Sequence, residues 1–210
     1  MKKISGREIK KALAKSAWDL GNKALYKLCS EHPLHKKDQE IIAKIWLIGR
    51  SYAAAIERHK SKSSDAKGDK FYERKVAPKI RRSEIDKWFA QLKKNPIAEN
   101  AIETHSKLTE LFYAISELEK RSLASKYLHF HRPDLFFIFD SRSVAAIRKV
   151  TPRGGKQLPS LSPKESDKDY ASFYRRCLWL KIDLQKRFRR KLSPRQIDKV
   201  LLYIADSKKK

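Results

Sequence analysis

The stretch from Leu123 to Ser143 reads LASKYLHFHRPDLFFIFDSRS. Its first part, which carries Lys126, is typical of a helix, and Pro133 ends that helix because proline removes a backbone hydrogen bond. Five apolar residues, LFFIF, then lead directly to Asp140, and SRSVAAIRKV predicts the next helix. Asp140 therefore lies where a helix N-cap is expected, at the mouth of the cavity that the phenylalanines would line.

The charge of the chain narrows the choice of partners. The 210 residues include 50 Lys and Arg against 24 Asp and Glu, which gives a net charge of +26. A surplus of this size points to a polyanion, and nucleic acid is the leading choice, because contacts of Lys and Arg with phosphates release counterions. A cationic surface kept for solubility or ribosome association is the alternative. With 40% hydrophobic residues and four tryptophans, the chain can bury a core.

Several classes of protein are disfavoured by the same composition. Cys29 and Cys177 lie far apart and share no metal-ligand spacing with a histidine, so we expect no disulfide framework and no metal site. No apolar run approaches the roughly 18 residues that span a bilayer. The basic start MKKISGREIKK has no apolar signal core behind it. We expect no membrane partner and a cytoplasmic or nucleoid-associated location.

Helix signals dominate outward from the opening stretch. A capping box at Ser5–Glu8 predicts a helix whose apolar positions continue to Leu28. QEIIAKIWLIGRSYAAAIERH, residues 39–59, predicts a central helix whose small residues permit close approach. Residues 170–191 and 193–206 predict two closing helices, and LFFIF alone cannot form a sheet. We therefore predict an all-α fold of about eight helices, in a single domain over residues 1–210. Mobile basic loops are expected near residues 60–82 and 151–169.

A helical hairpin is predicted just before the opening stretch. SELEKRSLASKYLHF indicates the end of one helix, a tight turn around Lys120–Ala124, and a second helix carrying Lys126. Backbone amides at a helix N-terminus can receive a phosphate. We accordingly expect Ser122, Ala124 and Ser125 to contact DNA.

These motifs resemble the helix-hairpin-helix DNA glycosylase superfamily, and most closely its bacterial branch similar to 8-oxoguanine DNA glycosylase. The resemblance is carried by SLASKYLHF, the P, F and FDSRS that follow it, the early WLIGRSYAAAIER and the terminal SPRQIDKVLLYI. The family's hairpin lysine falls on Lys126 and its aspartate on Asp140. The resemblance implies a two-lobed fold with a cleft, arranged around the hairpin as the DNA-binding element.

The resemblance also implies a reaction for these two residues. A glycosylase flips its target base out of the duplex and breaks the glycosidic bond, which leaves an abasic site. A partly desolvated Asp140 would stabilise the oxocarbenium character of the sugar. A neutral Lys126 would attack the sugar carbon, and the resulting Schiff base would allow strand cleavage, an AP-lyase activity. The turn KRSLAS lacks the glycines usual in the family. The interval from Lys126 to Asp140 is also shorter than in many members. A monofunctional enzyme with Asp140 activating water thus stays open.

Further candidates flank the two catalytic residues. Predicted DNA contacts beyond the hairpin are Arg142, Arg148, Lys149, Arg153 and Lys156. Candidates for the base pocket are His129, His131, Trp88, Phe112 and Tyr113. For the basic residues a solvated face is the alternative interpretation. For the histidines and aromatic residues the alternative is a place in the core.

The expected substrate is double-stranded DNA with a damaged or modified base, bound by a monomer without a cofactor. Two settings are open: repair of an oxidised purine such as 8-oxoguanine, and defence against phage DNA that carries a bulky modified cytosine. The alternative from another class is a non-catalytic DNA- or RNA-binding module that shares the hairpin fold. A nuclease is disfavoured because no cluster of carboxylates predicts a magnesium site.

Overall fold

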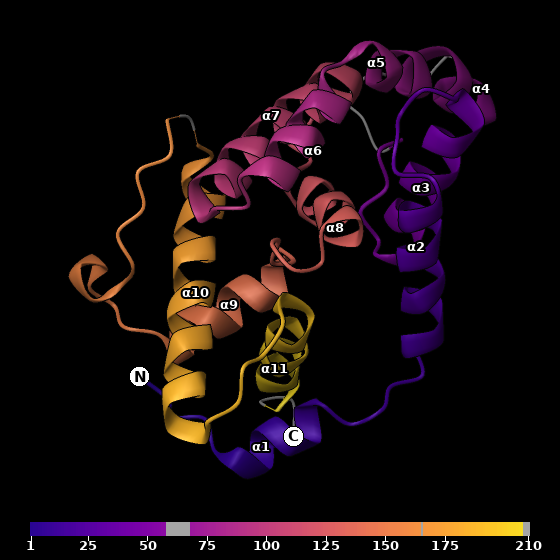
Figure 1. Ribbon diagram of the computed structural model, residues 1–210. Helices are drawn as coiled ribbons and strands as arrows, with labels where there is room; N and C mark the ends of the chain where they lie inside the picture. The colour runs from indigo at the N-terminus through magenta and orange to yellow at the C-terminus, as the bar shows by residue number, and fades with distance from the viewer. Residues whose placement is uncertain (58–67, 165, 208–210) are drawn as a thin grey trace.

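The computed structural model describes residues 1–57, 68–164 and 166–207, and every regular element in these ranges is helical (Figure 1). The elements are α1 (Gly6–Ala12), α2 (Asp19–Glu31), α3 (Asp38–Ser51), α4 (Asp69–Phe71), the π-helix η2 (Tyr72–Val76), α5 (Ala77–Arg82), α6 (Ile85–Lys94), α7 (Ala98–Ser116), α8 (Arg121–His131), α9 (Ser141–Val150), the 3₁₀ turn η3 (Gly155–Gln157), α10 (Lys168–Phe188) and α11 (Pro194–Asp206). The predicted all-α class is confirmed. With α4, η2 and α5 counted as one continuous helix, the described ranges hold ten helices rather than eight.

Helix α8 occupies the centre of the molecule and carries Lys126. It packs against α2, α3 and α7, and eight of its residues are buried, among them Tyr127 and Leu128 (Figure 1). Helix α9, which Asp140 precedes, packs instead against α10 and α11, and α11 packs in turn on α1. The two catalytic candidates thus belong to neighbouring helix groups, which the segment before Asp140 connects.

That connecting segment, residues 132–140, begins with a turn and contains no helix or strand. Leu135, Phe136, Phe137 and Ile138 are buried, so their backbone polar groups need partners other than water. Side chains from the surrounding helices provide them: Tyr174 donates to the Leu135 carbonyl at 2.8 Å, His129 Nδ1 lies 2.8 Å from the Phe136 oxygen, Tyr170 donates to the Phe137 carbonyl at 3.2 Å, and the Phe139 amide donates to Ser125 Oγ at 2.9 Å. These bonds hold the chain that leads to Asp140 in one fixed path.

Two predicted helices are shorter than the sequence pattern indicated. The first ends at Ala12, and the chain turns through residues 13–18 before α2 begins. The central helix ends at Ser51 rather than at residue 59, and Ala53 adopts a left-handed φ of 50°. Gly49 permits this turn, because a Cβ there would lie 3.2 Å from the Cα of Ala55. Small residues were predicted to let another helix approach closely. Gly49 instead lets the turn that follows α3 approach the helix.

The first predicted basic loop is helical where the structure describes it. Residues 69–82 form α4, η2 and α5, and the stretch from 58 to 67 lies outside the described residues. The apolar residues of this stretch are buried: Phe71, Tyr72, Val76, Ala77 and Ile80. Their spacing fits a helix, but six of the fourteen residues from 69 to 82 are Lys or Arg, so the composition indicated a loop.

The second predicted loop is irregular over residues 151–164 and 166–167 apart from η3, and α10 begins at Lys168. Asp167 caps α10 by accepting from the Tyr170 amide at 2.9 Å. Among the residues that the structure describes, no helix is both long and apolar enough to span a membrane.

Candidate active site

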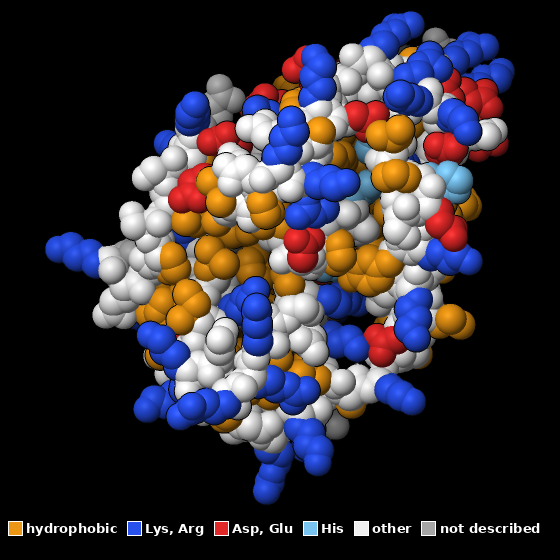
Figure 2. All heavy atoms as spheres, in the orientation of Figure 1, with side chains coloured by type: hydrophobic (Ala, Val, Ile, Leu, Met, Phe, Trp, Pro, Cys, Tyr) orange, Lys and Arg blue, Asp and Glu red, His pale blue; other side chains and the backbone are white. Residues whose placement is uncertain are grey.

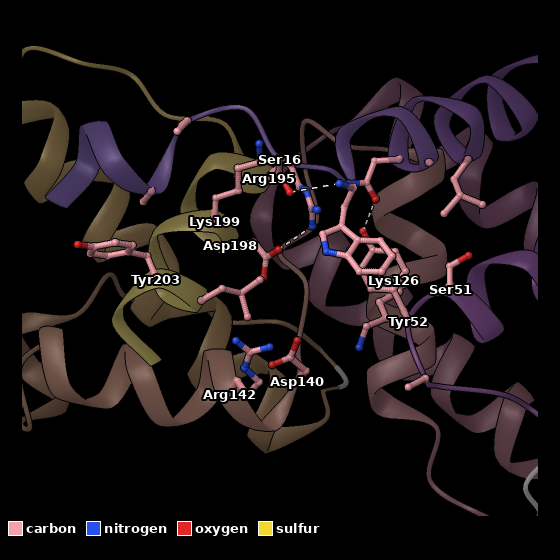
Figure 3. A pocket seen from close by; sticks show the side chains of 18 of the residues that line it. Ser16, Ser51, Tyr52, Lys126, Asp140, Arg142, Arg195, Asp198, Lys199 and Tyr203 are labelled. Carbon is pink, nitrogen blue, oxygen red and sulfur yellow. Dashed lines mark hydrogen bonds and ion pairs between the residues drawn. The ribbon is translucent and has the colours of Figure 1, made fainter. Parts of the chain in front are cut away.

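A pocket of about 1120 Å³ opens between the two helix groups, and both catalytic candidates line it (Figure 3). Its wall is built from the connection between α1 and α2, the start of α2, the end of α3, α8, the start of α9 and α11. Figure 3 shows Tyr52 and Lys126 on one side and Asp198 and Lys199 of α11 on the other. The surface between α2 and α11 is hollowed, and Lys and Arg side chains lie in the hollow (Figures 1 and 2).

Lys126 is a buried cationic side chain, only 2% exposed. Its Nζ donates to Ser122 Oγ at 2.5 Å and to the Phe139 carbonyl at 3.4 Å, and it lies 5.9 Å from the centre of the Tyr52 ring. Burial lowers the pKa of Lys126, because desolvation penalises the ammonium, while Asp140 and Asp198 act in the opposite direction. The fraction of neutral amine is therefore larger than on a solvated lysine, which favours nucleophilic chemistry.

Asp140 caps α9, as its position in the sequence predicted. Its Oδ1 accepts from the backbone amide of Ser143 at 2.9 Å, and its side chain is partly buried. The helix N-terminus stabilises the carboxylate through the orphan amides and the helix dipole. Because this bond engages one of the two oxygens, the cap is compatible with a role for the other oxygen inside the pocket.

A second carboxylate, Asp198 of α11, lines the pocket and is missing from the sequence-based candidates. It is 3% exposed, accepts from Ser143 Oγ at 3.2 Å and pairs with Arg195 at 2.7 Å. Burial raises the pKa of Asp198 to about 6; Arg195 opposes this shift and Asp140 adds to it. The sequence could have indicated Asp198, because it lies on the same helical face as Pro194 and Leu201, and a carboxylate is uncommon on a buried face.

Tyr52 contacts three other residues that line the pocket. Its hydroxyl donates to Asn22 Oδ1 at 2.6 Å, and its ring lies 5.9 Å from both Lys126 Nζ and Arg195 Cζ. Burial raises the pKa of this phenol above its ordinary value, so the hydroxyl keeps its proton at neutral pH. Tyr52 was not among the sequence-based candidates, because the apolar pattern placed it inside an unbroken helix, whereas it lies just after the end of α3.

The turn before α8 differs from the predicted one. Helices α7 and α8 pack on each other and are joined by residues 117–120, and Glu117 takes a left-handed φ of 59°. The predicted turn Lys120–Ala124 is the first turn of α8, since the Ala124 amide donates to the Lys120 carbonyl at 2.8 Å.

The burial of this turn decides which of the predicted hairpin contacts remain. Ala124 and Ser125 are fully buried, so their predicted contact with DNA is wrong. Ser122 lines the pocket, where it accepts the bond from Lys126.

The predicted basic contacts fall into two groups. Arg142 lines the pocket and pairs with Asp206 of α11 at 2.5 Å. The others are exposed, at the end of α9 and in the following irregular segment, away from the pocket wall: Arg148, Lys149, Arg153 and Lys156. Their contact with DNA stays a prediction.

None of the five residues predicted for the base pocket lines the pocket that the described residues form. His129 is fully buried and bonded to Tyr26 and to the Phe136 carbonyl, and burial lowers its pKa to about 4. The remaining four occupy the core or the surface elsewhere: His131 stacks on His35 and Phe89, Phe112 is fully buried, Trp88 packs against the core, and Tyr113 is 52% exposed on α7. Helical spacing already favoured the core for the aromatic residues.

No protein family, curated protein or solved structure matches the chain. Functional inference accordingly depends on the chemistry of the pocket.

Proposed function

We propose that the chain is a DNA glycosylase of the helix-hairpin-helix type that flips a modified base into the pocket, excises it and cleaves the strand as an AP lyase. One observation carries the proposal. A lysine amine that is almost fully withdrawn from water and the carboxylate of Asp140 line the same pocket, in a chain of net charge +26. In this proposal the duplex lies across the pocket mouth, in a cleft between the α2–α3 side and the α9–α11 side.

The surroundings of Lys126 support its role as nucleophile. A lysine must lose a proton before it can attack, and burial shifts the equilibrium of Lys126 in that direction. Its neutral amine attacks the C1′ carbon of the sugar as the glycosidic bond breaks. The base leaves with the bonding electrons and takes a proton from solvent. The carboxylate of Asp140 stabilises the positive charge that develops on the sugar during this step.

Strand cleavage follows from the same covalent bond. Opening of the sugar ring moves a proton to O4′ and produces an imine between C1′ and Lys126. Loss of a C2′ proton then expels the 3′ phosphate by β-elimination, and water hydrolyses the imine to release the lysine. No metal or other cofactor is needed to balance these steps, because each transfers only protons and electron pairs.

Basic residues on the pocket rim support DNA as the substrate. Lys11, Lys15 and Arg142 line the pocket and are exposed. Cations placed around two central carboxylates hold phosphates at the rim while the sugar meets Asp140 and Lys126 inside. The arrangement suits a substrate with a charged backbone on both sides of the reacting nucleotide. Repair of an oxidised purine and attack on a modified phage cytosine are both consistent with it.

The experiment uses duplexes that carry one 8-oxoguanine, 5-hydroxymethylcytosine or glucosylated 5-hydroxymethylcytosine. Abasic sites are detected by alkaline cleavage, and borohydride is added to reduce any imine. We expect a trapped adduct with the wild type and with the control Lys36→Gln, which removes an exposed lysine that does not line the pocket. Lys126→Gln should give none.

Two other outcomes change the assignment. Abasic sites without an adduct would leave a monofunctional glycosylase in which Asp140 activates water. Salt-sensitive binding of every duplex without any cleavage would contradict the enzyme and favour the non-catalytic binding module.

A further inference from the structure

Trp18 is a large aromatic side chain that lines the pocket and yet is 76% exposed. Burial of an indole in the core would stabilise the fold, so its position in an open pocket has no structural benefit. Its surroundings are nevertheless well fastened. The Trp18 amide donates to Ser16 Oγ at 3.3 Å, the Ser16 amide donates to Asp19 at 2.9 Å, and Asp19 pairs with Lys199 of α11 at 2.8 Å. These bonds hold the backbone that carries the indole beside the pocket.

Asn22 lies one helical turn further along α2, and its backbone N–H donates to the Trp18 carbonyl at 3.0 Å. Residues four apart share a face of a helix, and both line the pocket. Asn22 is 8% exposed, and its Oδ1 is engaged by the Tyr52 hydroxyl at 2.6 Å. Its Nδ2 is buried without a hydrogen-bond partner among the described residues. A buried donor without a partner lowers the stability of the fold, so the side-chain nitrogen of Asn22 points to a ligand that accepts a hydrogen bond.

We propose that Trp18 and Asn22 form the base-reading wall of the pocket. The indole stacks on the flipped base, and Asn22 Nδ2 donates to a carbonyl oxygen on the edge of that base. This inference rests on the proposed function and names its substrate class: planar bases that carry a ring carbonyl, which include oxidised guanine and modified cytosine. Adenine, which has no carbonyl, is outside the class.

The two residues contribute differently to recognition. Stacking on an indole tolerates any base, because every base has a π-face, so Trp18 adds affinity without selectivity. A hydrogen bond to Nδ2 discriminates, because a base without an acceptor leaves the buried donor unpaired. In the structure the Tyr52 hydroxyl engages the oxygen of the Asn22 side-chain amide and leaves its nitrogen unpaired, and the same tyrosine lies beside Lys126. The wall that reads the base is thus continuous with the residues that cleave the sugar.

The test compares hypoxanthine with adenine, two purines that differ at C6, a carbonyl against an amino group, and at the neighbouring N1, which carries a proton only in hypoxanthine. Each is placed opposite a tetrahydrofuran abasic analogue, so that neither is paired, and carries a 2′-fluoro sugar, which slows cleavage by disfavouring the oxocarbenium. Binding is measured by fluorescence anisotropy. We expect the wild type to bind the hypoxanthine duplex about tenfold more tightly, the ratio typical of one hydrogen bond that satisfies a buried donor.

Variants separate the two roles. Asn22→Asp replaces the donor by acceptors and should remove or reverse the preference, and Asn22→Ser should remove it with a smaller change. Trp18→Ala should weaken both duplexes by about tenfold or more, the range measured for loss of base stacking, and Trp18→Phe should restore part of the binding. A duplex with tetrahydrofuran in place of the base measures backbone binding alone and should be unaffected.

Different results contradict the proposed function and the base-reading wall. Equal affinity for the two duplexes, unchanged in Asn22→Asp and Trp18→Ala, overturns the base-reading wall even if Lys126 forms an adduct. A preference for hypoxanthine that depends on Asn22 supports the wall even if the glycosylase assay finds no cleavage.

Discussion

Asp140 and Asp198 come from the starts of different helices and are joined through a single buried residue. Ser143 donates its backbone amide to Asp140 at 2.9 Å and its hydroxyl to Asp198 at 3.2 Å, and it is fully buried. The position of each carboxylate in the pocket therefore depends on the same turn of α9. Asp198 in turn pairs with Arg195, which lies over the Tyr52 ring.

Removal of the Ser143 hydroxyl should disturb Asp198 and leave the cap at Asp140 in place. We expect Ser143→Ala to lower the free energy of unfolding by about 1 kcal/mol, the usual cost of removing a buried hydrogen bond. The rate of adduct trapping should fall as well. Urea denaturation and trapping time courses measure the two effects, with the exposed Ser30→Ala as control. Unchanged stability and trapping rate would show that the link is unimportant.

Asp198 should make stability depend on pH in a defined direction. Its folded pKa of about 6 lies above the ordinary value of 3.8, so the folded state holds this proton more tightly than the unfolded state. The contribution to stability is then fully present below pH 3.8 and is lost as pH rises through about 6, a loss of about 3 kcal/mol in order of magnitude.

Asp198→Asn tests this directly. Urea denaturation of the wild type and the variant at pH 4 and pH 7 should show the wild type losing stability relative to the variant as pH rises. A constant difference between the two proteins would contradict the raised pKa.

Two substitutions at Asp140 distinguish a helix cap from a catalyst. Asparagine caps a helix about as well as aspartate, so Asp140→Asn should change stability by only a few tenths of a kcal/mol. It should nevertheless lower base excision about a hundredfold or more, because the stabilising charge is removed. Asp140→Ala should lose both activity and about 1 kcal/mol of stability.

The cap of another helix provides the control for Asp140. Ser193→Ala removes the capping box of α11 and should cost stability with little effect on excision. Full activity in Asp140→Asn would leave Asp140 as a cap only.

DNA affinity should depend steeply on salt, because the net charge of +26 implies release of counterions. Replacement of Arg148, Lys149, Arg153 and Lys156 by glutamine should reduce the slope of log K against log salt by about 0.9 for each phosphate that the variant no longer neutralises. Anisotropy titrations across a range of salt concentrations measure the slope.

A control variant removes equal charge from exposed lysines that do not line the pocket: Lys36, Lys37, Lys93 and Lys94. Equal slopes in the two variants would contradict a specific role for the residues after α9.

Local signals in the sequence predicted much of the fold. The capping box at Ser5 and the N-cap at Asp140 are confirmed, because each depends on residues three positions apart. The all-α class followed from helical spacing of apolar residues. The helix over residues 69–82 was missed because the many Lys and Arg residues of this stretch indicated a loop. The ends of α1 and α3 were missed because the apolar spacing continues past Ala12 and Ser51, whereas the chain turns there.

The candidate site was predicted in part. Lys126 and Asp140 line one pocket, although α8 and α9 pack against different helices. Asp198, Tyr52, Asn22 and Trp18 were missed because α11, α3 and α2 meet the pocket only through tertiary packing, which no local pattern reports. The predicted aromatic and histidine residues do not line this pocket, because their side chains fill the core or lie elsewhere on the surface.

The central claim is that the amine of Lys126 attacks the sugar, and the position of a reduced adduct tests it most directly. The wild type is incubated with a modified-base duplex and borohydride, digested with nuclease and protease, and analysed by mass spectrometry. The account predicts that the sugar remnant is attached to Lys126. A remnant on any other lysine or on the N-terminal amine, with Lys126 unmodified, would contradict it.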